Sequence, residues 1–535
     1  MVDSRILQDM AETSEIPSEL RSIWTSNGLP EGFLQHLKLT GNPDTAIPSS
    51  FKLGLAAQIS IGLAALSAAY VHYLRTGVEQ DVTVNARHAV LAFHSEAWYT
   101  INDSPPEGEI WDTVAGLYQN KGGEYVRIHT NFPHHRSGVL QVLSIPDHPI
   151  RATRADVSKA LANWDAEEFE DACGKRGMCV FKLRTLEEWN ETPQGKALKG
   201  AKVVDVRKVG EAGKKTYSHP ELEGIKRPLQ GVKMLDLSRV LAGPVAGRAL
   251  AAQGAQVLLI TSPNLPALPL LDTETSLGKR TTQLDLNSPS DKEKLGGLVR
   301  GADVFLQAYR PKGVEGKGFG VEDVIKIKSG AEGVVYASLR AWGWDGSWSD
   351  RRGFDSLVQT ATGFNYDEGK EYQSFLLAQG QGDAKWAPRP LPMQALDHAA
   401  GYFLAFGINV GIAKSITEGG SHEIRVSLAA VGQWIRSLGR HSPLEAFGPE
   451  SKPFPKRRSF PLDPEVEALS VEWEERKGGS AKGEKRKRRR MMALRQAGVL
   501  SLTPLREGVL SACEDGEDAD WGAPIRLNAD EPVWI

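Results

Sequence analysis

The chain places a carboxyl group and an imidazole next to each other at the start of a run of small, apolar residues. Asp397 and His398 lie in the segment LPMQALDHAAGYFLAFG, residues 391–407. An acidic residue at such a place can cap a helix or end a loop, and most residues of this kind are exposed. A carboxylate can also act as a nucleophile towards an activated carbonyl group. The pattern of the elements around Asp397 indicates whether its role is structural or chemical.

The pattern of elements around Asp397 occurs twice. Residues 53–93 and 396–435 each begin with a long Ala- and Gly-rich helix, pass through a threonine–glycine turn and a short alternating strand, and end in a second apolar helix. Only the second copy has the carboxylate, because the first has Leu55 and Ala56 near the corresponding place. An activity that needs this carboxylate would therefore belong to the second half alone.

The second half alternates strands with helices. We predict strands at residues 232–237, 255–260, 302–309 and 333–343 and helices at 245–253 and 290–300. This alternation predicts an α/β fold, a Rossmann-like doubly wound parallel sheet with a smaller α+β domain, and ligands bind outside the carboxyl ends of such strands. The turn at Gly243 and the loop 307–311 lie at such ends. Gly243 and Gly247 do not match G-x-G-x-x-G, so close packing is favoured over a dinucleotide site.

The first half contains the elements of a smaller unit. Two strands joined by a turn at residues 121–123 precede a helical region at 154–173, and the charged stretch 206–228 is the best linker. We divide the chain into an N-terminal extension, a helix with a small domain that lacks the nucleophile, a linker, a domain with the catalytic Asp, and a C-terminal segment with a basic low-complexity insertion. Their ranges are 1–50, 51–205, 206–230, 231–445 and 446–535.

Composition narrows the class of protein. The chain has 535 residues, a net charge of −3 and 41% hydrophobic residues, so it can fill real cores and has no global attraction to nucleic acid or anionic membrane. Three cysteines cannot form a disulfide framework, and the N-terminus is acidic and polar. We expect a cytosolic protein, with mitochondria as the alternative. The uncharged segment 53–71 is long enough to span a membrane, but its small residues favour a core helix.

Two further segments suggest binding functions that we do not assign. Six consecutive basic residues, 485–490, resemble a nuclear address or a nucleic-acid patch, but their low-complexity surroundings favour a solvated loop. His134 and His135 precede Arg136 in NFPHHR and have no carboxylate or cysteine at ligand spacing. We therefore predict no nucleic-acid partner, no membrane partner and no metal.

Five segments of the second half, taken in order, resemble successive blocks of the class III CoA-transferases, the CaiB/BaiF family. They read LDLSRVLAGPVAGRALAAQGAQVLLI, GKRTTQLDLNSP, ADVFLQAYRPKGVEGKGFGVEDV, VYASLRAWGWDGSWSDRRGFDSLVQTATG and LDHAAGYFLAFG. The first half resembles a different part of the same family through TGVEQDVTVNARHAVLAF, DTVAGLYQNKGGEYVRI and RTLEEW. The resemblance thus implies a fused or permuted two-half member, for which a homodimer is a candidate assembly.

The resemblance assigns roles to individual residues. The family's nucleophilic Asp falls at Asp397, and we expect the dipole of its helix to keep this carboxylate ionised at neutral pH. Coenzyme A would be a co-substrate, with no permanently bound cofactor. Arg351 lies beside Arg352, where some members have a basic residue for the phosphates. The resemblance implies that CoA contacts Leu241, Ala242, Gly243, Gln307, Ala308, Tyr309, Arg310 and Arg352.

Three functions follow from the resemblance. The first is transfer of CoA between an acyl-CoA and a free carboxylic acid through an aspartyl-CoA intermediate. The second is racemisation or epimerisation of an acyl-CoA, and the third is binding of CoA esters without catalysis. Racemases of the family use a His where this chain has Phe354, so the two-base reaction lacks its second base. His398 points about 100° away from Asp397 on a helix, which favours transfer.

Overall fold

The computed structural model describes residues 13–217, 224–328, 332–475, 488–509 and 522–535, and its centre is a seven-stranded sheet. The strand order is β11-β10-β9-β12-β13-β14-β8, and all neighbours are parallel except β8, which is antiparallel to β14. The strands are β8 (Asp205–Gly210), β9 (Lys233–Leu237), β10 (Gln256–Thr261), β11 (Arg280–Gln283), β12 (Val304–Gln307), β13 (Val335–Arg340) and β14 (Ser421–Ser427). The predicted α/β fold with a parallel sheet is confirmed.

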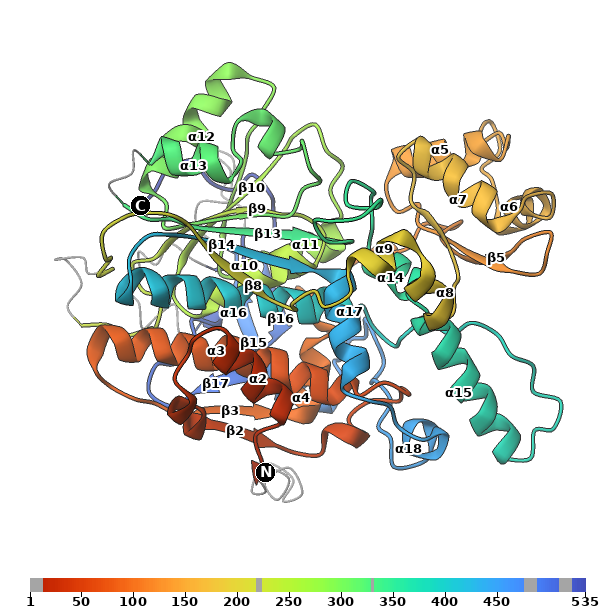
Figure 1. Cartoon of the computed structure of the whole chain (residues 1–535), viewed down its shortest axis with the longest axis horizontal. Coiled ribbons are helices and arrows are strands. Elements are labelled where there is room, and N and C mark those ends of the chain that lie inside the picture. Colours follow the sequence, from red (N-terminus) through yellow and green to blue (C-terminus); the bar gives the residue numbers. More distant parts are fainter. Residues whose placement is uncertain (1–12, 218–223, 329–331, 476–487, 510–521) are drawn as a thin grey trace.

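Helices cover both faces of this sheet (Figure 1). On one face, α12 and α13 pack with β9, β12 and β13 in a hydrophobic core of their own. On the other face, α10 and α16 belong to the larger core of the protein. The helices around the sheet are α10 (Ala242–Ala252), α11 (Pro269–Thr275), α12 (Pro289–Gly301), α13 (Val321–Ile327), α14 (Asp355–Ala361), α15 (Phe364–Ala378), α16 (Ala395–Thr417) and α17 (Leu428–Ser437).

Helix α3 (Leu53–Thr76) lies against α16 on the side away from the seven-stranded sheet (Figure 1). Its other side packs on a four-stranded sheet of order β1-β2-β3-β17. Helices α3 and α16 are long and apolar enough to cross a membrane, but 89% of the most apolar window of each is buried inside the protein. A helix that is apolar on all sides needs cover on all sides, and these two helices partly cover each other.

The four-stranded sheet and the segments around it come from both ends of the chain. Its neighbours are paired antiparallel except β2 and β3, which are parallel. The elements are β1 (Thr13–Ser14), α2 (Ser18–Ser26), β2 (Leu37–Thr40), β3 (Val82–Asn85), α4 (Ala86–Ala92) and β17 (Gly498–Leu500), with 3₁₀ helices Glu31–His36, Pro43–Thr45 and Ser95–Ala97. A further 3₁₀ helix, Glu315–Lys317, follows β12.

The predicted repeat is present in the structure. Helix α3, strand β3 and helix α4 follow one another as α16, β14 and α17 do. The turn after α3 contains Gly77 at φ 75°, and the turn after α16 contains Gly419 and Gly420 at φ 76° and 92°. These positive φ angles are easily adopted only by glycine. The two copies differ in their sheets, because β3 lies in the four-stranded sheet and β14 in the seven-stranded one.

Residues 112–182 form a small unit beside the main body (Figure 1). A three-stranded antiparallel sheet, β5-β6-β7, packs with three helices around a separate hydrophobic core. The predicted helical region 154–173 is two helices, because Asp165 accepts hydrogen bonds from the N–H groups of Glu167 and Glu168 and starts a new helix. The elements are β5 (Gly116–Gln119), β6 (Tyr125–Ile128), α5 (Pro133–Val142), α6 (Arg154–Leu161), α7 (Ala166–Lys175) and β7 (Val180–Lys182).

The segment predicted as a linker contributes an edge strand, β8, at residues 205–210. In the described part of the basic run, Arg488 and Arg489 form ion pairs with Glu474 and Glu475, while residues 485–487 lie outside the described residues. A second three-stranded sheet has the order β15-β16-β4. The remaining elements are α8 (Leu186–Glu191), α9 (Pro193–Ala197), α18 (Pro443–Phe447), α19 (Pro464–Ala468), β4 (Thr100–Ile101), β15 (Ser470–Glu474) and β16 (Arg490–Leu494).

Removal of the first half should expose the face of α16 that α3 covers. We expect residues 230–445, expressed alone, to aggregate or to lack activity, because a large apolar helix face would meet water. Size-exclusion chromatography of this fragment beside the full chain is the measurement. A monodisperse fragment with the activity of the full chain would contradict the dependence of α16 on α3.

Candidate active site

A cavity of about 320 Å³ lies where the carboxyl ends of β9, β12 and β13 approach the small unit. Side chains of both halves of the chain line it. Asp397 is among them, together with Phe132, His134, His135, Arg239, Val240, Leu241, Ala242, Gly243, Leu265, Ala308, Tyr309, Arg310, Pro311, Leu339, Arg340, Ala341, Ser349, Arg351, Arg352, Gly353, Phe354 and Leu428. The position agrees with the rule that open α/β sheets bind ligands beyond the carboxyl ends of their strands.

Asp397 lies in the first turn of α16, and its side chain faces this cavity. Only 8% of the residue is exposed. It does not cap the helix, because Gln394 is the N-cap residue and forms no side-chain cap. The backbone N–H of Asp397 donates to Oδ2 of Asp355 at 2.9 Å. The carboxyl group of Asp397 is thus held at the cavity by a helix that is buried on all sides.

The expectation that the helix dipole keeps Asp397 ionised is wrong, because burial and neighbouring charges dominate its pKa. Burial raises the pKa of Asp397 well above its usual value, and the nearby carboxyl groups of Asp355 and Glu96 raise it further. Burial also raises the pKa of Asp355 to about 6. Desolvation and two like charges outweigh a dipole effect that is typically worth less than about 1 kcal/mol.

His398 points away from the cavity into the protein. Its Nε2 atom lies 3.1 Å from Oε2 of Glu96, and Oε1 of Glu96 lies 3.0 Å from Nδ1 of His94. All three residues are buried. The two imidazoles help to hold the pKa of Glu96 below its usual value despite its burial. His398 therefore serves to pair a buried carboxylate of the first half, which agrees with the predicted direction of its side chain.

A buried ion pair supports the turn that forms one wall of the cavity. Lys279 is fully buried and donates to Oδ2 of Asp236 and to the carbonyl of Pro244, each at 2.8 Å. The hydroxyl of Ser238 donates to the other oxygen of Asp236 at 2.5 Å. A Cβ atom on Gly243 would overlap the Ser238 side chain, so this position needs glycine. The backbone of residues 241–243 can therefore come close to a ligand.

Seven of the eight residues predicted to contact CoA line the cavity. They are Leu241, Ala242, Gly243, Ala308, Tyr309, Arg310 and Arg352. Gln307 lies outside it, which corrects the expectation for this residue. Its amide donates to the hydroxyl of Ser338 at 3.2 Å, and its carbonyl accepts from the N–H of Tyr309 at 2.9 Å. Gln307 is the last residue of β12, where its side chain turns into the protein and fixes the loop that follows.

The five arginines of the cavity fall into two groups. Arg340 and Arg351 have carboxylate partners, Glu315 at 3.1 Å and Glu170 at 3.3 Å. The other three, which are Arg239, Arg310 and Arg352, form no ion pair with a carboxylate among the described residues. Uncompensated guanidinium groups on a concave surface are suited to phosphate oxygens. The cavity therefore has the charge expected of a site for a phosphorylated ligand.

Sequence reasoning missed the contribution of the small unit. Phe132, His134 and His135 enter the cavity from the segment at the start of α5. The motif NFPHHR gives no signal in the sequence for a place in this cavity, because only the tertiary structure brings it next to Arg352. Among the described residues no group of three or more His, Cys, Asp or Glu could hold a metal ion. Phe354, which replaces the racemase histidine, stacks on His129 of the small unit with ring centres 4.0 Å apart.

The raised pKa of Asp397 predicts a cost in stability. A carboxyl whose pKa is higher in the folded than in the unfolded chain destabilises the fold increasingly as the pH rises from its unfolded value of 3.8 through the raised value. Asp397→Asn should therefore raise the melting temperature at pH 8 by about 1–3 °C, with a smaller gain near pH 4. Thermal unfolding at both pH values measures this, with the exposed Asp383→Asn as control. A lower melting temperature at pH 8 would contradict the burial argument.

Part of the chain is similar to known CoA-transferases. Residues 229–441 match the family model described as CoA-transferase family III. An acyl-CoA transferase of Gibberella moniliformis (strain M3125 / FGSC 7600) is 34% identical over 51% of this chain and 47% of its own length. The acetyl-coenzyme A transferase nodX of Hypoxylon pulicicidum is 25% identical over 75% of this chain and 72% of its own length. A solved CaiB/BaiF family protein of Brucella suis is 22% identical over 40% of this chain and 56% of its own, with a TM-score of 0.31.

The chain spans about half the length of the first of these relatives. The family match extends from β9 to α17 and so includes Asp397, the turn at residues 241–243 and the loop at 308–311. These are the segments on which the family resemblance of the sequence depended, and that resemblance is confirmed. Residues 229–441, which we call the family domain, are similar in sequence to CoA-transferase family III.

Proposed function

We propose that the protein transfers CoA between an acyl-CoA thioester and a free carboxylic acid, with Asp397 as the nucleophile. The observation that carries this proposal is one buried carboxyl group in a cavity with three arginines that have no carboxylate partner among the described residues. The guanidinium groups would bind the phosphates of CoA, and the carboxyl group of Asp397 would react with the thioester of the acyl-CoA. Relatives named acyl-CoA transferase and acetyl-coenzyme A transferase support the reaction class.

The reaction needs only groups that the cavity holds. The ionised form of Asp397 is the reacting species: one of its carboxylate oxygens attacks the thioester carbonyl, the C–S bond breaks, and an acyl-aspartyl anhydride and the CoA thiolate result. The thiolate then attacks the aspartyl carbonyl, which releases the donor acid and leaves an aspartyl-CoA thioester. The acceptor carboxylate attacks this thioester, and the thiolate returns to the new acyl group. Asp397 is regenerated as a carboxylate, and no water is consumed.

The surroundings of Asp397 fit a carboxylate that is the nucleophile in the first step and the leaving group in the last. Burial removes water, which would otherwise hydrolyse the anhydride. The neighbouring carboxyl groups of Asp355 and Glu96 destabilise the charged form of Asp397 before attack. Its charge is lost when the anhydride forms, so this repulsion is relieved during the reaction. The N–H of Asp397 is fixed by Asp355, which sets the start of the helix.

A second hollow extends the cavity towards β10 and β11. It measures about 210 Å³, shares Leu265 and Tyr309 with the first cavity, and reaches Asn287 and Lys317. CoA is a long ligand with its thiol at one end and its nucleotide at the other. With the thioester at Asp397 and the phosphates near Arg239 and Arg310, this hollow is the place for the adenosine.

Asp397→Ala should abolish CoA transfer and leave the protein folded. We expect a loss of at least about 10³-fold, because the covalent route depends on this carboxylate. After incubation with a panel of acyl-CoAs, intact-mass analysis should detect a CoA or acyl adduct on the wild-type chain and none on the variant. Retention of more than a few per cent of wild-type transfer would remove Asp397 from the mechanism. A wild-type chain without adduct or transfer would favour a silent binding protein.

Racemisation is the alternative within the same family, and it needs a second base. Phe354 and His398 cannot serve, and His134 is the histidine of the cavity that forms no hydrogen bond with another side chain in the described part of the chain. A chiral 2-methylacyl-CoA in heavy water, without an acceptor acid, should gain no deuterium at its α-carbon beyond the enzyme-free control. Addition of a suitable acid should yield a new thioester. Deuterium uptake that depends on Asp397 would instead establish racemisation, and His134→Phe would then identify its second base.

A further inference from the structure

We propose that His135 is a positioning residue that directs the guanidinium of Arg352 towards the phosphates of CoA without cancelling its positive charge. The inference rests on the proposed function for the identity of the ligand. His135 belongs to the small unit, and Arg352 belongs to the family domain, 217 positions further along the chain. Their contact crosses the cavity wall between the two halves.

The hydrogen bonds of His135 define its tautomer. Nη1 of Arg352 lies 2.6 Å from Nε2 of His135, and a guanidinium can only donate. Nε2 is therefore the acceptor, so the ring proton is on Nδ1. Sγ of Cys179, a fully buried free thiol, lies beside the ring, 3.6 Å from Nδ1 and 3.8 Å from Nε2. A ring that accepts through Nε2 carries a single proton and is neutral.

The surroundings keep the imidazole neutral at every physiological pH. Burial lowers the pKa of His135 to about 2, and the neighbouring His134 and Arg352 lower it further. Burial also raises the pKa of the Cys179 thiol to about 12, so the sulfur carries no charge. Arg352 consequently has a hydrogen-bond acceptor but no counter-charge from this side.

The adjacent arginine shows the opposite arrangement. Arg351 is paired with Glu170 at 3.3 Å and stacks on Phe181, with 4.6 Å between its guanidinium carbon and the ring centre. Arg184 also pairs with Glu170, at 2.8 Å, so this carboxylate is shared by two guanidinium groups. Arg352 lies close enough to Arg310 for each charge to disfavour the other, which lowers the pKa of Arg352 after the effect of burial. Two neighbouring cations held apart from carboxylates attract an anionic ligand strongly.

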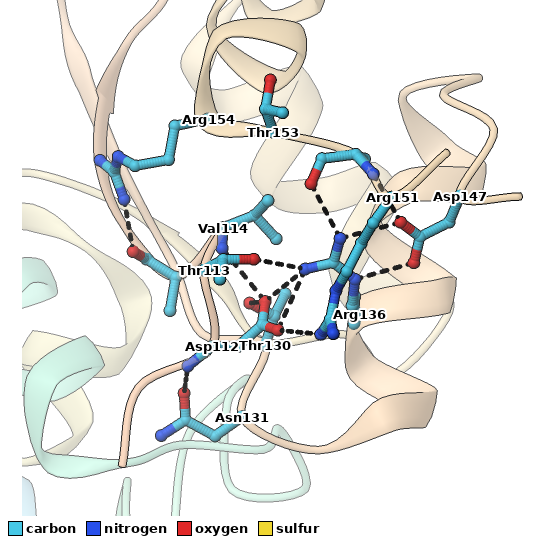
Figure 2. A network of polar contacts seen from close by, with 12 residues as sticks. Asp112, Thr113, Val114, Thr130, Asn131, Arg136, Asp147, Arg151, Thr153 and Arg154 are labelled. Carbon is cyan, nitrogen blue, oxygen red and sulfur yellow. Dashed lines mark hydrogen bonds and ion pairs between the residues drawn. The ribbon is translucent and has the colours of Figure 1, made fainter. Parts of the chain in front are cut away.

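The segment that carries His135 is itself fixed by a buried ion-pair network (Figure 2). Arg136 donates to both oxygens of Asp112 at 2.9 and 3.0 Å and to both oxygens of Asp147 at 2.8 Å. Thr130 donates to Asp112 at 2.8 Å, and Asn131 accepts from the N–H of Asp112 at 3.0 Å. Thr130, Asn131 and Arg136 flank Phe132, His134 and His135, which line the cavity. The network therefore holds one side of the segment while the other side meets the ligand.

Direct binding of CoA tests the proposal independently of transfer. His135→Phe keeps a ring but removes the acceptor, and it should weaken binding of free CoA about five- to twentyfold. His135→Gln retains an acceptor and should recover most of the affinity. His135→Glu should pair with Arg352, cancel its charge and weaken binding at least as much as His135→Phe. Isothermal titration calorimetry with CoA gives the dissociation constants, and His72→Phe, a buried histidine on α3 outside the cavity, is the matched control.

Two shorter ligands, pantetheine and dephospho-CoA, identify the phosphate group of CoA that Arg352 contacts. Pantetheine has no phosphate, so its binding should be the same in wild type and His135→Phe. Dephospho-CoA lacks only the 3′-phosphate: a loss that persists with it assigns Arg352 to the diphosphate, and a loss that disappears assigns Arg352 to the 3′-phosphate. Either result supports the proposal.

Unchanged CoA binding in folded His135→Phe and His135→Glu would overturn the proposal, as would an equal loss for pantetheine or a wild-type chain that does not bind CoA. Failure of the proposed function has a different signature, because CoA would bind but no thioester would be exchanged. If His135→Phe does not fold, His135→Glu decides the outcome, since its ion pair with Arg352 supports the fold while removing the charge.

Discussion

The structure depends on the burial of one helix, α16, on every side. Its residues are apolar around the whole circumference, so no face of it can meet water without a large cost. The seven-stranded sheet and α10 cover one side, and α3 covers the other. Gly401 allows α10 to come so close that a Cβ atom there would overlap the carbonyl of Ala242. The first half of the chain is thus needed for the core of the second.

The burial of α16 also determines the environment of Asp397. Because Asp397 occupies the first turn of α16, the constraint that buries the helix places a carboxyl group in a poorly hydrated position beside Asp355 and Glu96. The fold bears an electrostatic cost at this point, as functional sites commonly do. The same cost raises the energy of the charged nucleophile relative to the neutral anhydride. Burial of Asp397 therefore destabilises the folded chain and at the same time makes the carboxylate more reactive.

Both halves of the chain contribute residues to the cavity. The family domain provides Asp397, the turn at residues 241–243 and the arginines, and the small unit provides Phe132, His134 and His135. The two adjacent arginines meet different partners across this boundary. Arg351 contacts the carboxylate of Glu170, which it shares with Arg184, whereas Arg352 contacts the neutral ring of His135. A cation intended for phosphate has to be oriented without being paired, and an imidazole of low pKa satisfies both conditions.

The sequence by itself determined the features that depend on local pattern. Alternating strands and helices predicted the parallel sheet, and the position of Gly243 and of loop 308–311 after strands predicted which residues line the cavity, because strand ends converge in this fold. The sequence could not place His135 against Arg352 or Glu96 against His398, because residues more than 200 positions apart meet only through tertiary packing. Nor could it give the protonation of Asp397. The helix position suggested an ionised carboxylate, but desolvation and neighbouring charges set a pKa, and both are properties of the folded interior alone.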